Sequence, residues 1–296
     1  MYSEIESNKR KTILFMFGFF VLVSLVAYGV GWYFKEWFIT AFALVFAVGY
    51  ALWSYYGSDK LALSVNNAVQ IEKKDNPRLW RIVENLAITD GLPMPRVYII
   101  DDPAPNAFAT GRDPKHAAVA ATTGILDMMT DTELEGVFAH ELGHIRNFDI
   151  RLAMVAFGLV AAVSMISDMV LRMMFWGSAF GDDDSPGGNN PVFMLVGIIA
   201  LILAPIVAGL IQLAISRKRE YLADATGALT TRYPEGLASA LEKIENSGSV
   251  MQKQSPSTSH LFFANPLKGG NLAGLFSTHP PVDERIARLR EMGGKV

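Results

Sequence analysis

Four long apolar runs place the strongest limit on the folds that this chain can adopt. They cover residues 12–34, 37–56, 152–176 and 192–215, and each is long enough for a helix to cross a hydrocarbon layer ~30 Å thick. A content of 51% hydrophobic residues is also high for an ordinary soluble domain. We therefore expect a mainly α-helical protein with four membrane spans, paired as two helical hairpins.

The polar segments between these runs define the other parts of the chain. A short N-terminal segment covers residues 1–11, and a hydrophilic loop over 177–191 joins the two spans of the second hairpin. Two larger polar parts, residues 57–151 and 216–296, have the composition of protein that faces water. They are expected to form one α+β domain, which the hairpins over 12–56 and 152–215 interrupt and anchor.

Basic residues indicate on which side of the membrane this domain lies. Lys9, Arg10 and Lys11 precede the first run, while Arg217, Lys218 and Arg219 directly follow the fourth. Short loops rich in lysine and arginine stay in the cytoplasm. The sequence therefore predicts a multi-pass protein with both termini and both polar parts in the cytoplasm.

A pentapeptide in the first polar part carries the clearest chemical signal. His140-Glu141-Leu142-Gly143-His144 matches H-E-x-x-H, in which two histidines one helical turn apart hold one Zn²⁺ and the glutamate serves as general base. A helix is expected here because Thr130 and Glu133 form a capping-box pattern shortly before it. The pattern is typical of a zinc protease in which Glu141 takes a proton from the attacking water.

The third zinc ligand has to come from elsewhere in the chain. Cysteine is absent, and Glu220 is the leading candidate because the second hairpin brings it to the same membrane edge as His144. Asp224 follows one turn later and is suited to accept a hydrogen bond from a ligand histidine. Asp149 is expected to point away, because it lies five residues beyond His144. Three other acidic residues remain alternatives: Glu235, Glu242 and Glu245.

Short extended segments predict a small sheet before the H-E-x-x-H helix. They cover residues 96–100, 106–110 and 116–122, and a helix over 77–92 precedes them. An exposed edge strand in such a sheet can pair with an extended peptide, although an ordinary packed sheet explains the pattern as well. Two further helices are expected over residues 234–246 and 281–292.

Four motifs together resemble the HtpX-type membrane zinc metalloproteases, relatives of the CAAX prenyl protease. They are Asn106-Ala107-Phe108-Ala109-Thr110-Gly111, the H-E-x-x-H pentapeptide, Arg219-Glu220-Tyr221-Leu222-Ala223-Asp224, and Thr278-His279-Pro280-Pro281. With the four apolar runs, these motifs cover nearly the whole chain in order. The resemblance implies a gluzincin-type protease domain with one zinc ion on His140, His144 and Glu220.

The resemblance also implies roles for other residues and a setting for the enzyme. Glu141 is then the catalytic base and Asp224 orients a ligand, while Asn106 lies on a substrate-binding edge strand and His279 polarises the scissile carbonyl. A bacterial plasma-membrane endopeptidase is implied, with a cytoplasmic active site that cleaves damaged or misfolded membrane proteins. Its partners are thus protein substrates and the lipid bilayer.

Other functions are weighed against this one. A non-catalytic scaffold or holdase with structural zinc needs a fourth ligand, for which His116, His260, His279 or another carboxylate are candidates. An intramembrane protease is disfavoured by the charged residues around the pentapeptide, and a transporter by the scarcity of charge within the runs, where Asp168 and Arg172 stand. A net charge of −3 argues against nucleic acid, and no pattern indicates the oligomeric state.

Overall fold

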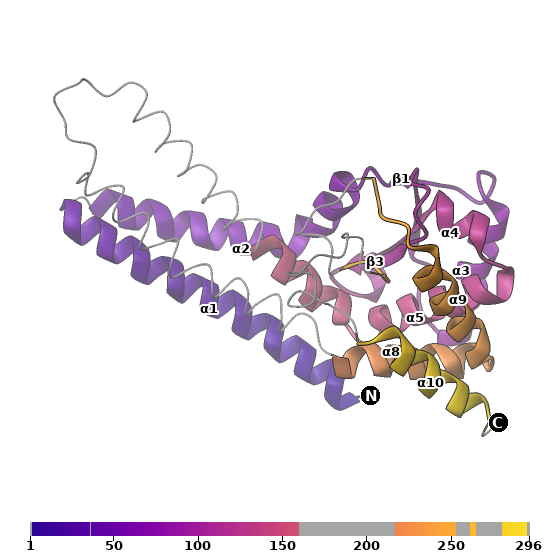
Figure 1. The fold of residues 1–296 in the computed structure, drawn as a ribbon. Coiled ribbons are helices and arrows are strands. Elements are labelled where there is room, and N and C mark those ends of the chain that lie inside the picture. The colour runs from indigo at the N-terminus through magenta and orange to yellow at the C-terminus, as the bar shows by residue number, and fades with distance from the viewer. Residues whose placement is uncertain (1, 36, 160–216, 253–260, 265–279, 295–296) are drawn as a thin grey trace.

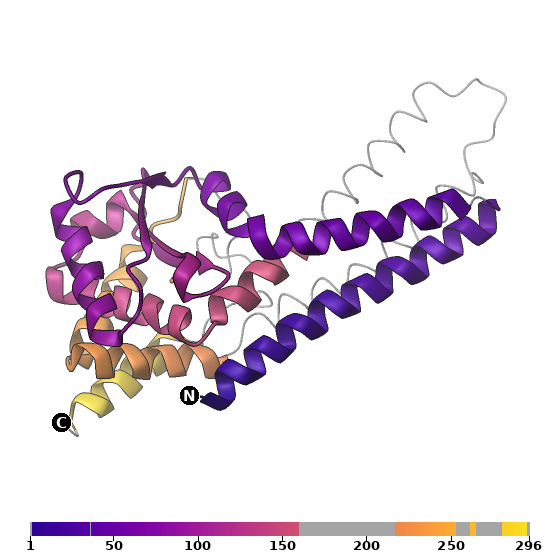
Figure 2. The ribbon, with the colours of Figure 1, turned by 180° about the vertical axis from the view of Figure 1, so that it is seen from behind.

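Helices form most of the structure, and a small sheet is its other component. The computed structural model describes residues 2–35, 37–159, 217–252, 261–264 and 280–294. In Figures 1 and 2, a long helical hairpin extends from a rounded part that holds the sheet and the other helices. The prediction of a mainly helical protein with a small sheet is confirmed.

The hairpin consists of α1 (Tyr2–Phe34) and α2 (Trp37–Val65), which lie side by side in Figures 1 and 2. Near the tip, the Thr40 hydroxyl donates to the carbonyl of Ala27 at 3.0 Å. Both helices are longer than the predicted spans. α1 includes the polar residues that precede the first span, and α2 continues past the second span to residue 65. Within the described ranges, Thr40–Val65 has the length and apolar character of a membrane span.

The second predicted hairpin lies mostly outside the described residues. A helix begins at residue 149 and is described as far as residue 159. The Tyr50 hydroxyl on α2 donates to the carbonyl of Gly158 in that helix at 2.7 Å, so the start of the third run packs against the first hairpin. The rest of the span over 152–176, the loop over 177–191 and the span over 192–215 are not described, and the four-span arrangement stays a prediction.

Four strands form a mixed sheet in the order β1-β2-β4-β3. β2 and β4 run parallel, whereas the outer pairs β1-β2 and β3-β4 are antiparallel. β3 is an edge strand, so one side of its backbone is not paired with another strand of the sheet. Three strands match the predicted segments to within one residue, and the short β1 was not predicted. The strands are β1 (Val69–Gln70), β2 (Arg96–Ile100), β3 (Ala107–Gly111) and β4 (Ala117–Thr122).

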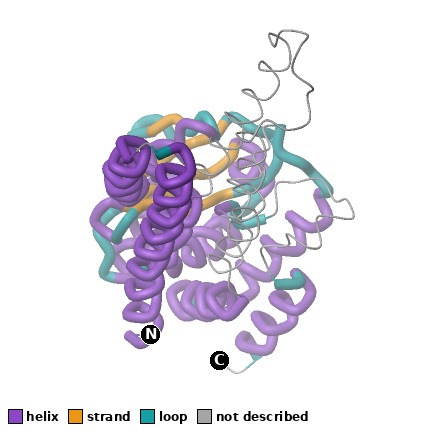
Figure 3. Tube along the Cα trace, turned by 90° about the vertical axis from the view of Figure 1, so that its left-hand side faces the viewer, coloured by secondary structure: helices purple, strands orange, loops and turns teal. Residues whose placement is uncertain are grey.

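Helices pack beside the sheet, as the end-on view of the hairpin in Figure 3 shows. α5 is central and contacts α3, α8 and α9. Its capping box is confirmed, since the Thr130 side chain accepts from the Glu133 amide while Glu133 accepts from the Thr130 amide. The helices are α3 (Pro77–Asp90), α4 (Thr123–Met128), α5 (Asp131–Arg146), α8 (Arg217–Thr231), α9 (Pro234–Ser247) and α10 (Val282–Gly293).

Glycines let the backbones around α5 approach closely. A Cβ on Gly136 would lie 2.6 Å from the backbone nitrogen of Leu237 in α9, and a Cβ on Gly227 of α8 would lie 3.0 Å from that of His140. Real Cβ atoms essentially never sit at the first distance. The segments before residue 160 and after residue 216 are therefore joined tightly around the pentapeptide.

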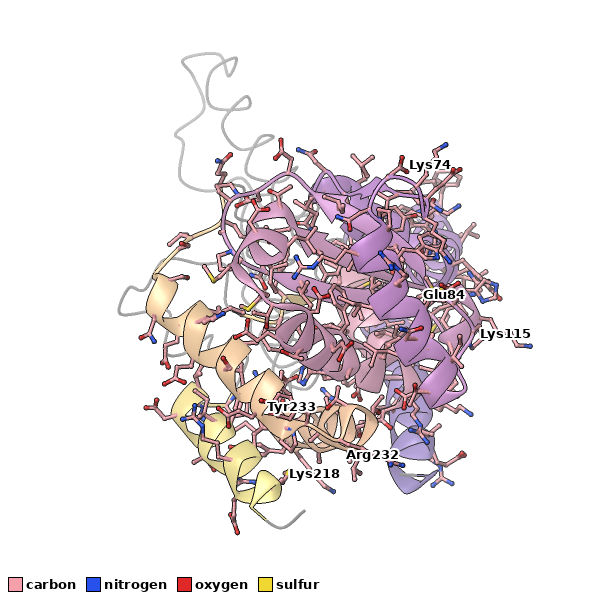
Figure 4. All side chains as sticks on the ribbon, turned by 90° about the vertical axis from the view of Figure 1, so that its right-hand side faces the viewer. Lys74, Glu84, Lys115, Lys218, Arg232 and Tyr233 are labelled. Carbon is pink, nitrogen blue, oxygen red and sulfur yellow. The ribbon has the colours of Figure 1, made fainter. Side chains whose placement is uncertain are left out.

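The face turned away from the hairpin is polar. Figure 4 views this face, and the side chains of Lys74, Glu84 and Lys115 point outward from it. Lys73 pairs with Glu84 at 3.0 Å and Lys74 with Glu72 at 3.0 Å, and these side chains are substantially exposed. This part of the protein thus has the surface expected of a domain in water.

Candidate active site

Both histidines of the pentapeptide lie on one face of α5. The distance between His140 Nε2 and His144 Nε2 is 3.1 Å, and the two rings are perpendicular with their centroids 4.7 Å apart. His140 and Glu141 are almost fully buried, with exposed fractions of 1% and 2%. The helical spacing inferred from the sequence therefore holds, and both imidazoles present the same nitrogen to a common point.

α8, which follows the second predicted hairpin in the sequence, brings Glu220 to this point. Its carboxylate oxygens lie 3.5 Å from His144 Nε2 and 3.7 Å from His140 Nε2. Ligand atoms bound at about 2.0–2.2 Å to a tetrahedral Zn²⁺ are about 3.3–3.6 Å apart. The spacing of these three groups, whose atoms all lie within 4.8 Å of one another, thus fits one zinc ion.

Asp224 and Arg285 hold His140 from behind. Asp224 Oδ1 lies 2.9 Å from His140 Nδ1, as expected for a residue that orients the ring. Arg285 of α10 donates from Nε and Nη2 to the two oxygens of Asp224, at 2.9 and 2.7 Å. Burial alone would raise the pKa of Asp224, but Arg285 and His140 together outweigh it and lower the pKa to about 2. Arg285 was not predicted as a site residue, because a single arginine in an amphipathic helix carries no local signal.

Asp149 performs the same task for His144, contrary to the expectation that it points away. Its Oδ2 lies 3.0 Å from His144 Nδ1. The expectation was wrong because it continued the helix past its end: α5 stops at Arg146, and Phe148 adopts a left-handed φ of 59°. The chain therefore turns back, and Asp149 reaches the histidine that it follows.

The surroundings of the two histidines set their proton affinities in opposite directions. Burial lowers the pKa of His140, more than its hydrogen bond to Asp224 raises it. Burial also opposes protonation of His144, but the hydrogen bond to Asp149 and the charge of Glu220 outweigh it and raise that pKa. Of the two imidazoles, His144 therefore has the higher proton affinity.

A cavity of about 50 Å³ adjoins these groups and has room for a few water molecules. Glu141 lines it together with both histidines and Glu220, and Ala109 of β3 forms part of its wall. A carboxylate, three potential ligands and an edge strand thus face the same small space. This is the arrangement needed to hydrolyse an extended peptide beside a metal.

Asn106 lies directly before β3 and binds the segment of residues 261–264. Its side-chain amide donates to the Ala264 carbonyl at 2.8 Å and accepts from the Ala264 amide at 3.1 Å. One residue later, the Ala107 carbonyl accepts from Phe263 at 2.8 Å. The edge of β3 is therefore occupied at its start, while the outward backbone groups of Ala109 face the cavity.

The remaining candidates from the sequence are placed elsewhere or are not described. Glu235 and Glu242 both pair with Arg290 on the surface, away from the histidines. His116 pairs with Asp113 at 2.8 Å outside the site. Glu245 is exposed and does not belong to the potential ligand group. His260, His279, Asp168 and Arg172 lie outside the described residues.

Comparison with known proteins agrees with this geometry. The sequence model of "Peptidase family M48" matches residues 73–293. The chain belongs to peptidase family M48. A "Protease HtpX homolog" of Tropheryma whipplei (strain Twist) is 54% identical over 295 residues, covering 100% of this chain and 99% of the relative. A protein of the same name from Ligilactobacillus salivarius (strain UCC118) is 46% identical over 295 residues, covering 99% and 100%.

A solved structure extends the comparison to the fold of the M48 peptidase. The crystal structure of S. mikatae Ste24p superposes with a TM-score of 0.52 at 19% sequence identity, covering 98% of this chain and 67% of that one. Family and relatives identify a membrane zinc metalloprotease, as the resemblance implied. The scaffold and the transporter are thereby set aside as alternatives.

Proposed function

We propose that His140, His144 and Glu220 are the protein ligands of a single zinc ion. The observation that carries this proposal is the convergence of their ligand atoms within 4.8 Å, from helices that lie on either side of the second predicted hairpin. Within the described part of the chain, this group contains three residues. Three protein ligands and an open fourth position are typical of catalytic zinc, whereas structural sites are closed by four.

Glu141 is the proposed catalytic base. A zinc ion bound in this site would polarise the scissile carbonyl and lower the pKa of the attacking water. Glu141 takes a proton from that water and passes it to the leaving amine. Asp224 and Asp149 hold the Nδ1 sides of the two histidines, so that both Nε2 atoms stay directed at the same point.

The proposed substrate is an extended segment of a damaged or misfolded membrane protein. It pairs with the edge of β3 at Ala109, beside Glu141. Asn106 is a candidate for shaping this edge, and His279 is a candidate for contact with the scissile carbonyl. Proteolysis is supported by relatives named "Protease HtpX homolog". Membrane proteins are favoured as substrates because the apolar hairpin would hold the site close to a bilayer.

The proposed setting is the bacterial plasma membrane, with four spans and a cytoplasmic active site. Arg146 at the end of α5 is partly exposed and pairs with Asp90 at 3.4 Å, which favours a site in water over one within the bilayer. Because the chain has no cysteine, single introduced cysteines report topology directly. Lys74→Cys should react with a membrane-impermeant thiol reagent only after the cells are opened, and reaction in intact cells would contradict the orientation.

The role of Glu141 is tested by comparing the wild type with Glu141→Gln in detergent. We expect equal zinc content in both proteins, and a loss of casein cleavage of about 10²–10⁴-fold in the variant, the range that general acid–base catalysis supplies. Cleavage at the wild-type rate by Glu141→Gln would assign the base elsewhere.

The ligand assignment has its own matched pair of variants. Glu220→Ala should lose bound zinc, whereas Glu235→Ala, which removes a surface glutamate paired with Arg290, should retain it. Zinc measured by elemental analysis of both purified proteins decides the matter. Full occupancy in Glu220→Ala would mean that another residue completes the site.

A further inference from the structure

The turn that carries Asp149 is held by residues from the N-terminal helix. Phe148 has a left-handed φ of 59°, a conformation that costs a bulky residue roughly 1–2 kcal/mol and persists only where the surroundings enforce it. Lys9 of α1 lies over the Phe148 ring at 5.0 Å, and Arg151 lies over it at 4.8 Å. The first turns of α1 therefore brace the segment that follows the pentapeptide.

Asn8 makes the direct connection to Asp149. Its side-chain nitrogen donates to Asp149 Oδ1 at 2.7 Å and to the Asn147 carbonyl at 3.0 Å. Asn8 is 1% exposed and Asp149 is 7% exposed, so water does not replace these hydrogen bonds. Since Asp149 Oδ2 contacts His144 Nδ1 at 3.0 Å, a continuous chain of hydrogen-bonding groups runs from α1 to the proposed zinc ligand.

The choice of asparagine at this position is not explained by packing. No hydrogen-bond partner is described for the buried Asn8 Oδ1, and an unpaired buried amide oxygen costs about 1–3 kcal/mol. A leucine of similar size would fill the space without this cost. What asparagine adds is its two N–H donors, and both are directed at the turn of residues 147–149.

Besides Asn8 and His144, Arg219 also lies close to Asp149. Its Nε lies 3.5 Å from Asp149 Oδ1, the same oxygen that accepts from Asn8. The distance from Asn8 Nδ2 to Asp149 Oδ1 is 0.8 Å shorter than that from Arg219 Nε. The side-chain N–H of Asn8 also has the geometry of a hydrogen bond to this oxygen. Asn8 thus sets the rotation of the Asp149 carboxylate, which leaves Oδ2 for His144.

We infer that Asn8 is a positioning residue of the metal site, which acts on His144 through Asp149. The inference rests on the proposed function, in which His144 is a zinc ligand. It also gives α1 a second task besides anchoring the protein: this helix, which precedes the region matched by the family model, supports the geometry of the active site. Fixing a ligand ring in this way raises metal affinity and slows metal loss.

The test uses the full chain in detergent and measures zinc release to a chelator together with the visible absorption of the Co²⁺-substituted protein. Asn8→Leu removes the donors at similar volume, and Asn8→Asp keeps size and polarity but turns the donor into an acceptor. Direct hydrogen-bond partners of metal ligands typically change metal affinity 10–100-fold. Because Asn8 acts one residue further out, we expect zinc release about 3–10-fold faster and an altered Co²⁺ spectrum in both variants.

Thr12→Val is the matched control, because Thr12 is equally buried on α1 and its hydroxyl donates to the Asn8 carbonyl, away from Asp149. It should release zinc at the wild-type rate. Equal effects of Thr12→Val and Asn8→Leu would overturn the inference, since the docking of α1 alone would then explain them. Wild-type release and spectra in both Asn8 variants would overturn it as well.

His144→Ala separates failure of this inference from failure of the proposed function. Loss of zinc from His144→Ala, combined with unchanged Asn8 variants, overturns the positioning role and leaves the ligand assignment standing. Full zinc occupancy in His144→Ala overturns the ligand assignment itself, and the inference falls with it.

Discussion

Arg285 is a buried cation whose removal should destabilise the protein strongly. Its side chain is 1% exposed and donates two hydrogen bonds to Asp224, the residue behind His140. Arg285→Met retains much of the apolar stem but leaves the Asp224 carboxylate buried without its partner. Breaking a buried ion pair in this way costs about 3–5 kcal/mol. At about 2–4 °C per kcal/mol, the thermal midpoint Tm should fall by roughly 6–20 °C.

The assay is thermal unfolding of the zinc-free protein in detergent, so that metal loss does not contribute to the difference in Tm. Arg288→Met is the control: Arg288 lies on the same helix, is half exposed and pairs with Glu284, and an exposed pair contributes only about 0–1 kcal/mol. Asp224→Asn combined with Arg285→Met should recover part of the loss, because no unpaired charge remains. If Arg285→Met unfolds together with the wild type, the buried pair does not support this structure.

Two further predictions concern α5. Glu133 accepts hydrogen bonds from Ser239 at 2.6 Å and Lys243 at 2.8 Å; burial opposes its ionisation, but these bonds outweigh it and lower its pKa to about 2. Its contribution is therefore complete above pH ~4.5, the range of an unfolded glutamate, and is lost as the pH falls toward 2. Glu133→Gln should lower the free energy of unfolding by about 1.5–3 kcal/mol at pH 6, and denaturant titrations should give a smaller difference at pH 3; a constant difference would contradict the assignment. Gly136→Ala gains about 1 kcal/mol of helix propensity, but its Cβ would meet the Leu237 backbone nitrogen at 2.6 Å, and overpacking costs about 1–3 kcal/mol. Denaturant titrations should therefore show a net loss of stability, and a variant more stable than the wild type would refute the close approach of α5 and α9.

Local patterns were enough to predict the elements that carry the site. The capping box at Thr130 and Glu133 placed the start of α5 correctly, because the hydrogen bonds involved span only three residues. The strands β2, β3 and β4 were found to within one residue from short extended patterns. Glu220 was placed near His144 by the predicted topology, since a hairpin over residues 152–215 would bring its two ends together whatever its internal structure.

Contacts that depend on helix ends or distant helices were not accessible in this way. The position of Asp149 was predicted wrongly because the helical periodicity was extended past the residue at which the helix ends. A phenylalanine at position 148 also gives no indication that the backbone adopts a left-handed conformation there. Arg285 and Asn8 each reach the site from more than 130 residues away in the chain. Their roles depend on how whole helices pack against one another. The sequence pattern of a single helix does not indicate this packing.

The long separation between Asn8 and Arg285 bears on how the enzyme is made. These residues support the two histidines of the site from opposite ends of a 296-residue chain. Ribosomes add about 5–20 residues per second, so on the order of 15–60 s pass between the synthesis of the first support and that of the last. In the last part of this interval, after residue 224 has been added, the pentapeptide and Asp224 are both present while Asp224 still lacks the cation of Arg285. We expect the nascent protein to become proteolytically active only after its final helix has docked, because Asp224 and His140 lack the support of Arg285 until then.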